Sequence, residues 1–226
     1  MKRAPYYLMF FLSVGVSAYA AVAYGLFEPG ALVHPDMRPA FEARAAALRL
    51  HIFASILALA LGPLQFSVAL RARRPRVHRM VGKVYLAVGV GIGGLSGLYL
   101  AQEAFGGAIA RAGFATLALA WLYTGVQGYL AVRRRDIARH REWMVRNFAL
   151  TFAAVTLRIY LPSSMVAGIP FEVAYPVIAW LCWVPNLVAA NLWIRSGALE
   201  STHEKRPPGP GRVPRREPGL RTATRP

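Results

Sequence analysis

The chain has 226 residues, of which 56% are hydrophobic, and a mean hydropathy of +0.37. A soluble domain of this size does not need so much apolar material, and the apolar residues come in blocks of about twenty, the length that a helix needs to cross a bilayer. The formal net charge of +17 is confined to particular loops and the tail, which argues against nucleic acid as a partner. Composition therefore predicts an all-α membrane protein.

We expect residues 1–195 to form a polytopic transmembrane bundle of about six helices. The spans are placed at residues 6–27, 50–70, 84–101, 112–132, 145–162 and 172–194, because each is apolar and close to the length that crosses about 30 Å of hydrocarbon. Residues 161–171 hold two prolines and a glycine, so a turn or a shallow re-entrant segment is expected there. Residues 196–226 are rich in Pro, Gly and Arg and are predicted to be a disordered basic tail.

The distribution of Lys and Arg predicts the orientation in the membrane. All but five of the 27 lie in the N-terminus, in two basic segments between spans, or in the tail. With six spans these four regions fall on one side, and the positive-inside rule makes that side cytoplasmic. Both termini are therefore expected in the cytoplasm. The five exceptions are Arg38, Arg44, Arg49, Arg111 and Arg158.

The two basic segments share a plan. Residues 71–85 read RARRPRVHRMVGKVY and residues 133–146 read RRRDIARHREWMVR, so each carries a His-Arg pair just before an apolar stretch. If both segments face the same side of the membrane, His78 and His140 lie at similar depth. This pair is the first candidate for chemistry.

The pair predicts a site for a b-type haem or a quinone on the cytoplasmic side. Two histidines on neighbouring helices can supply both axial imidazoles, and arginines can pair with propionates. Gly89, Gly93 and Gly97 form a stripe that admits either a flat ligand or another helix. His78 and His140 are candidate haem iron ligands. The further candidates for cofactor binding are His51, Arg79, Arg141, Arg158 and Tyr85.

Two other interpretations stay open. The basic segments could instead contact anionic lipid headgroups, with Tyr85, Tyr129 and Trp143 as aromatic anchors at the interface. Polar residues inside the spans could form a transport pathway for a small molecule or lipid. Neither a phosphate-binding loop, nor zinc-ligand spacing, nor a nucleophile elbow occurs in the sequence, so whether the protein is an enzyme stays undecided.

Arg158 has its own two interpretations. Only eleven residues separate it from Arg146, whereas a span needs about twenty, so one of the two must lie in or near the hydrocarbon zone. An intramembrane arginine usually faces the interior of a bundle or an anionic partner. An arginine near a helix end can also extend to the headgroups.

The sequence also resembles a known family. His51, the LGPLQF run, HRMVGKVY and the later RRRDIARHREWMVRNFAL resemble the bacterial predicted membrane proteins called domain of unknown function 2306, over about residues 48–161. The resemblance implies a multi-pass protein of the bacterial inner membrane and supplies no mechanism. The order of helices and histidines is also similar to cytochrome b561-like bundles, although His51 has no histidine on the fourth helix to pair with.

Overall fold

The structure, a computed structural model, describes residues 3–28 and 30–197. This part is built from helices and contains no strand. Six helical stretches in it are long and apolar enough to cross a membrane. The all-α transmembrane bundle expected from composition is therefore confirmed. The predicted disordered tail, from residue 198 onward, lies outside the described residues.

The first three membrane-crossing stretches come from the N-terminal half. They are α1 (Arg3–Gly25), α3 (Ala45–Gln65) and a continuous rod of α5 (Pro75–Val84), the π-helical η2 (Tyr85–Ile92) and α6 (Gly93–Ala101). Three short elements lie between these stretches: η1 (Pro35–Met37), α2 (Arg38–Ala43) and α4 (Val68–Arg73).

The last three stretches come from the C-terminal half. They are α7 (Gly107–Arg133), then α8 (Ile137–Thr151) with α9 (Ala153–Val166), and α10 (Phe171–Leu181) with α11 (Val184–Arg195). The turn expected at residues 161–171 is shorter than predicted, because α9 continues through Pro162. The hydroxyls of Ser163 and Ser164 donate to the carbonyls of Ile159 and Leu161, so backbone acceptors near the proline are satisfied inside the helix.

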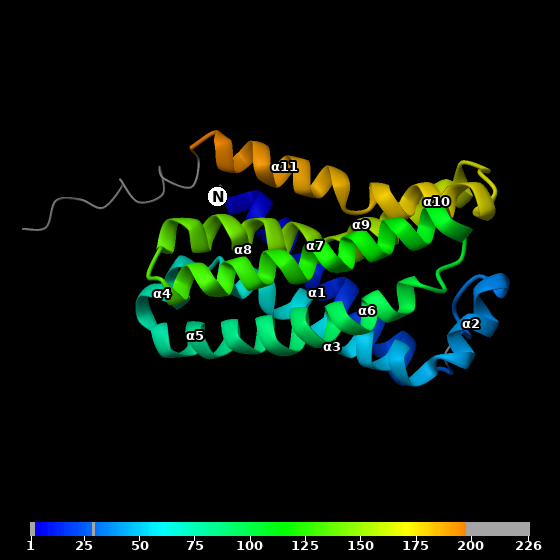
Figure 1. Cartoon of the computed structure of the whole chain (residues 1–226), viewed down its shortest axis with the longest axis horizontal. Coiled ribbons are helices and arrows are strands. Elements are labelled where there is room, and N and C mark those ends of the chain that lie inside the picture. The colour runs from blue at the N-terminus through cyan, green and yellow to red at the C-terminus, as the bar shows by residue number, and fades with distance from the viewer. Residues whose placement is uncertain (1–2, 29, 198–226) are drawn as a thin grey trace, which may run out of the picture.

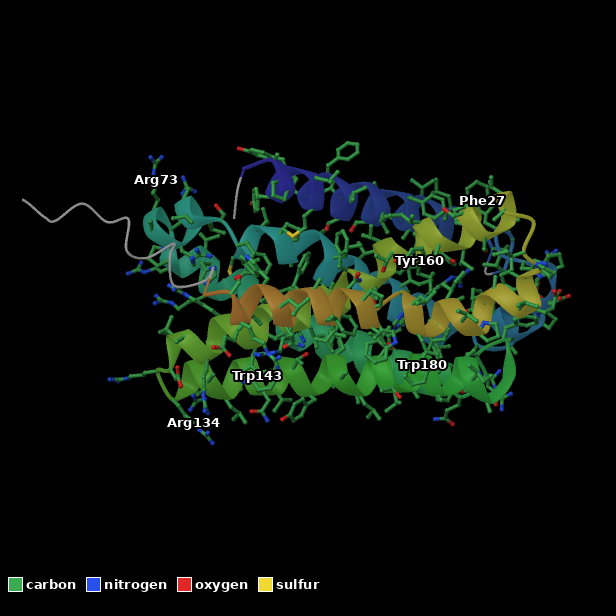
Figure 2. The ribbon with its side chains drawn as sticks, turned by 90° about the horizontal axis from the view of Figure 1, so that it is seen from above. Phe27, Arg73, Arg134, Trp143, Tyr160 and Trp180 are labelled. Atoms are coloured by element: carbon green, nitrogen blue, oxygen red, sulfur yellow. The ribbon has the colours of Figure 1, made fainter. Side chains whose placement is uncertain are left out.

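The six stretches lie roughly along one axis and give an elongated bundle (Figure 1). Both basic segments lie at one end, where α4 precedes α5 and where α7 turns into α8; Arg73 and Arg134 mark this end in Figure 2. We call the end formed by residues 71–79 and 133–141 the basic end. The opposite end, which holds α2 and the start of α10, is called the distal end.

The glycine stripe of η2 and α6 packs against α3. A Cβ built on Gly89 would lie 2.8 Å from the Ala58 Cβ and 3.0 Å from its backbone nitrogen, so the two helices approach at van der Waals distance there. Gly93 lies against Ser55 and Trp121, and Gly97 lies against the His51 ring. Small residues at this spacing let transmembrane helices pack closely. The stripe therefore holds a neighbouring helix.

Replacing Gly89 by alanine is expected to destabilise the bundle by roughly 1–3 kcal/mol, because α3 and η2 would have to move apart. The measurement is thermal unfolding of the purified protein in detergent. Gly15→Ala is the matched control, since a Cβ at Gly15 meets nothing within 4 Å. Equal melting temperatures for the two variants would contradict the close packing of α3 on η2.

Candidate functional site: a cavity in the distal half of the bundle

A cavity of about 570 Å³ lies among α1, α3, α6, α7 and α9. Its walls are mainly apolar, and it extends from Trp121 and Leu59 inside the bundle to Glu103 and Gly106 at the distal end. A few polar side chains converge on it: Ser17, Tyr24, Arg44, His51, Ser55, Glu103, Arg111, Thr151 and Arg158. An apolar hollow with a few convergent polar groups is the usual form of a site for a small ligand.

His51 is held by a backbone contact on the cavity wall. Its Nδ1 lies 2.8 Å from the carbonyl oxygen of Gly93, which can only accept a hydrogen bond. The proton of the neutral ring is therefore assigned to Nδ1, and Nε2 carries a lone pair. Nε2 makes no hydrogen bond within the described residues. His51 thus offers the cavity an acceptor or a metal-ligating nitrogen whose ring orientation is already set.

Arg158 of α9 is a cationic group of the cavity that lies within a span. Its Nη1 donates to the carbonyl of Ala154 at 3.0 Å, and its guanidinium lies 5.8 Å from the centre of the Tyr19 ring. Within the described part of the chain it forms no ion pair with a carboxylate. It also lies within electrostatic range of His51. The structure therefore favours the first interpretation of Arg158, in which the side chain faces the interior of the bundle.

The mouth of the cavity carries a charged bridge. Arg44 and Arg111 approach the two carboxylate oxygens of Glu103 at 3.3 and 3.9 Å. All three side chains line the cavity. Asp36 lines the cavity as well, so the two arginines and the two carboxylates at the mouth balance in charge.

Buried hydrogen bonds form a polar cluster on the inner side of the cavity. The Tyr85 hydroxyl donates to the Asn147 Oδ1 at 2.7 Å and lies 2.9 Å from the Thr151 Oγ1. The Trp121 indole also donates to the Thr151 Oγ1, and Asn147 donates to the Thr124 Oγ1. We call these five residues the polar cluster; they join η2, α7 and α8.

Tyr85 was expected either to bind a cofactor or to be an aromatic anchor at the interface, and its burial contradicts the anchor. Its side chain is 1% exposed, within the hydrophobic core. The cause is its position one helical turn before Gly89, on the face that the close approach of α3 covers. Tyr85 does not line the cavity, although its partner Thr151 does.

The two predicted haem ligands lie together at the basic end, away from the cavity. His78 is within electrostatic range of His140, Arg71 and Arg79. The Nδ1 of His140 lies 2.8 Å from the carbonyl of Gly128, whereas the buried Nδ1 of His78 has no hydrogen bond. Burial and the nearby Arg141 guanidinium lower the pKa of Arg71, whose Nη1 donates to the carbonyl of Gln65. This end is therefore crowded with positive charge.

Of the seven predicted cofactor-binding residues, the structure brings only His51 and Arg158 into the cavity. His78, Arg79, His140 and Arg141 belong to the basic end, and Tyr85 belongs to the polar cluster. Sequence reasoning missed Ser55, Thr151 and Asn147. The available signal was the spacing of Asn147 and Thr151, which places two polar groups on one face of a helix in an apolar stretch.

Six apolar helices around a cavity with few polar groups define a multi-pass membrane protein with a ligand-sized internal site. The family model described as predicted membrane protein (DUF2306) matches residues 48–194, and the chain belongs to this family. The match covers both His-Arg pairs, His51 and Arg158. No curated protein and no solved structure matches the chain in the same comparisons.

Tyr85→Phe is expected to destabilise the protein by roughly 1–2 kcal/mol, because Asn147 and Thr151 would each lose a partner in a place that water does not reach. Thermal unfolding in detergent measures the loss. Tyr99→Phe is the matched control, since Tyr99 is 51% exposed on α6. If both variants unfold at the wild-type temperature, the polar cluster does not stabilise the bundle.

Proposed function

We propose that the protein binds an isoprenoid quinone in the cavity, with the head group between His51 and Arg158. The observation that carries the proposal is the placement of these two side chains, 107 positions apart in the chain, on the wall of one mainly apolar cavity. A quinone matches this wall in chemical terms. Its ring carries two oxygens on opposite sides, and its tail is a hydrocarbon that apolar helices accommodate.

Arg158 supplies the donors that a quinone oxygen needs. A guanidinium has five N–H groups, and the contacts within the described residues use one of them, on the carbonyl of Ala154. An arginine within an apolar bundle is costly unless its charge is compensated. Electron-rich carbonyl oxygens compensate it in part, and an anionic head group would do so more fully.

His51 supplies a hydrogen-bond acceptor, whereas Arg158 supplies donors. With its proton on Nδ1, the ring presents the Nε2 lone pair, which accepts a hydrogen bond from a hydroxyl of the reduced ligand. A protonated ring would donate to the oxidised ligand instead. The same side chain can therefore bind the quinol and the quinone. The Gly93 carbonyl keeps the ring oriented in both cases.

A b-type haem is the second candidate, and one observation favours it. Ligating histidines commonly donate their second ring nitrogen to a backbone carbonyl, and His51 does so. The Nε2 of His51 would then be an axial ligand, and Arg158 would pair with a propionate. The predicted ligand pair His78 and His140 is the competing location, supported by the mutual proximity of the two rings at the basic end.

At the basic end we propose contact with anionic lipid headgroups. The support is the charge balance: α4, α5 and α8 carry eight arginines and lysines, whereas Glu142 of α8 is the one carboxylate of these three elements. Such juxtamembrane clusters attract anionic lipid by about 1 kcal/mol per cation. With the basic end cytoplasmic, as the positive-inside rule predicts, the cavity opens toward the other side of the membrane.

The quinone proposal is tested by extracting the detergent-purified protein with organic solvent and measuring quinone by mass spectrometry. The wild type is expected to retain about one quinone per chain. Arg158→Leu should weaken binding roughly ten- to hundredfold, the loss of a hydrogen bond from a charged donor. Arg49→Leu is the control, since Arg49 lies near the same end but does not line the cavity. Equal quinone content in all three proteins would contradict the proposal.

The haem alternative is tested by absorbance of the oxidised and the dithionite-reduced protein, purified from haem-sufficient cells. If haem is bound in the cavity, His51→Ala should abolish the Soret band, whereas His78→Ala and His140→Ala should keep it. The reverse pattern would assign the iron to the basic end. A colourless wild-type protein would remove haem and leave quinone extraction to decide between quinone and a ligand without redox chemistry.

A further inference from the structure

Three potential metal ligands meet at the distal end, at the border of the cavity described above. His34 and Asp36 flank Pro35 at the start of η1, and Glu172 lies in the first turn of α10. One ligand atom from each of the three side chains lies within 4.8 Å of the other two. The group joins a loop near the N-terminus to a helix more than 130 positions later in the chain.

The charges at this point are unusual for the chain. The described part contains seven Asp and Glu residues, and five of them form ion pairs with arginine. Asp36 and Glu172 are the two that have no arginine or lysine partner there, and they lie beside each other. Both carboxylates are exposed to solvent, which weakens their mutual repulsion, and a cation between them would remove it. The chain has 27 Lys and Arg residues, yet none of those in the described part forms an ion pair with Asp36 or Glu172.

The His34 ring is held in a fixed orientation beside the carboxylates. It stacks on Phe171 with the ring centres 4.1 Å apart and the planes within 8°. Its Nδ1 is inaccessible to solvent, makes no hydrogen bond and lies 3.5 Å from the Asp36 Oδ2. An unsatisfied nitrogen held at that distance from a carboxylate oxygen is an arrangement that a shared metal ion would complete.

We propose that His34, Asp36 and Glu172 bind a divalent transition-metal ion, with Zn²⁺ as the best match. Zn²⁺ accepts both imidazole nitrogen and carboxylate oxygen as ligands, and water can complete a set of three protein ligands. Ligand bonds of about 2.0–2.2 Å place neighbouring ligand atoms of a tetrahedral site roughly 3.4 Å apart, so a small movement of Glu172 closes the site. Mg²⁺ and Ca²⁺ are disfavoured because they prefer oxygen ligands.

The site would fix the distal loop to the bundle. Glu172 begins α10, and His34 and Asp36 begin the short helical segment that leads through α2 into α3. Asp36 also lines the cavity, so the metal would lie at the border of the ligand site. The proposal does not depend on the identity of the cavity ligand, because its three ligands are not the residues that bind the head group.

The test is a Zn²⁺ titration of the full-length protein in detergent after treatment with EDTA, in competition with a chromophoric chelator. The wild type is expected to bind one Zn²⁺ per chain and to gain thermal stability from it. His34→Ala, Asp36→Asn and Glu172→Gln should each weaken binding at least about tenfold, since each removes a direct ligand. Co²⁺ should give visible d–d absorption in the wild type, and Glu172→Gln should remove it.

Glu42→Gln is the matched control, because Glu42 lies in the same distal segment and pairs with Arg38 at 2.8 Å. It should bind Zn²⁺ as the wild type does. The proposal is overturned if the dissociation constant of the wild type for Zn²⁺ is weaker than about 100 µM. Clusters of surface carboxylates could bind Zn²⁺ that weakly. It is also overturned if the three ligand variants bind as tightly as Glu42→Gln, which would show adventitious binding elsewhere.

Discussion

Hydrogen bonds between polar side chains inside the hydrocarbon zone are the constraint on which the bundle depends. A polar group that water cannot reach must find a partner within the protein. The polar cluster meets this requirement by linking Tyr85 of η2, Trp121 and Thr124 of α7, and Asn147 and Thr151 of α8. Each hydroxyl and amide has one geometry that satisfies its neighbours. The cluster therefore sets the relative register of three helices more specifically than apolar packing does.

The cavity also contains polar groups without protein partners, as do a few buried positions elsewhere, such as His78. The Nε2 of His51 and the remaining donors of Arg158 have no protein partners in the described residues, and the buried Ser55 hydroxyl on the same wall also lacks one. The five side chains of the polar cluster, in contrast, all have partners within the protein. The unpartnered groups on the cavity wall support the proposal that the cavity binds a ligand with its own donors and acceptors.

The two ends of the bundle differ in the way their charges are compensated. At the distal end most arginines pair with carboxylates, as Arg44 and Arg111 do with Glu103. At the basic end cations far outnumber carboxylates. This asymmetry agrees with the membrane orientation expected from the positive-inside rule. Asp36 and Glu172 are the two carboxylates of the described residues that have no arginine or lysine partner there.

Composition and hydropathy alone determined the class of this protein: an all-α bundle of about six transmembrane helices. These properties are readable because span length and apolar content are local and the bilayer thickness is constant. Which face of each helix turns inward depends on packing that no local pattern contains. An interfacial position was one of two interpretations of Tyr85, an aromatic residue beside a basic segment, yet the side chain is buried where α3 packs closely on η2. His51 and Arg158 were each noticed separately. Only the tertiary structure brought them to one cavity, because contacts between helices far apart in the chain decide which polar groups share a space.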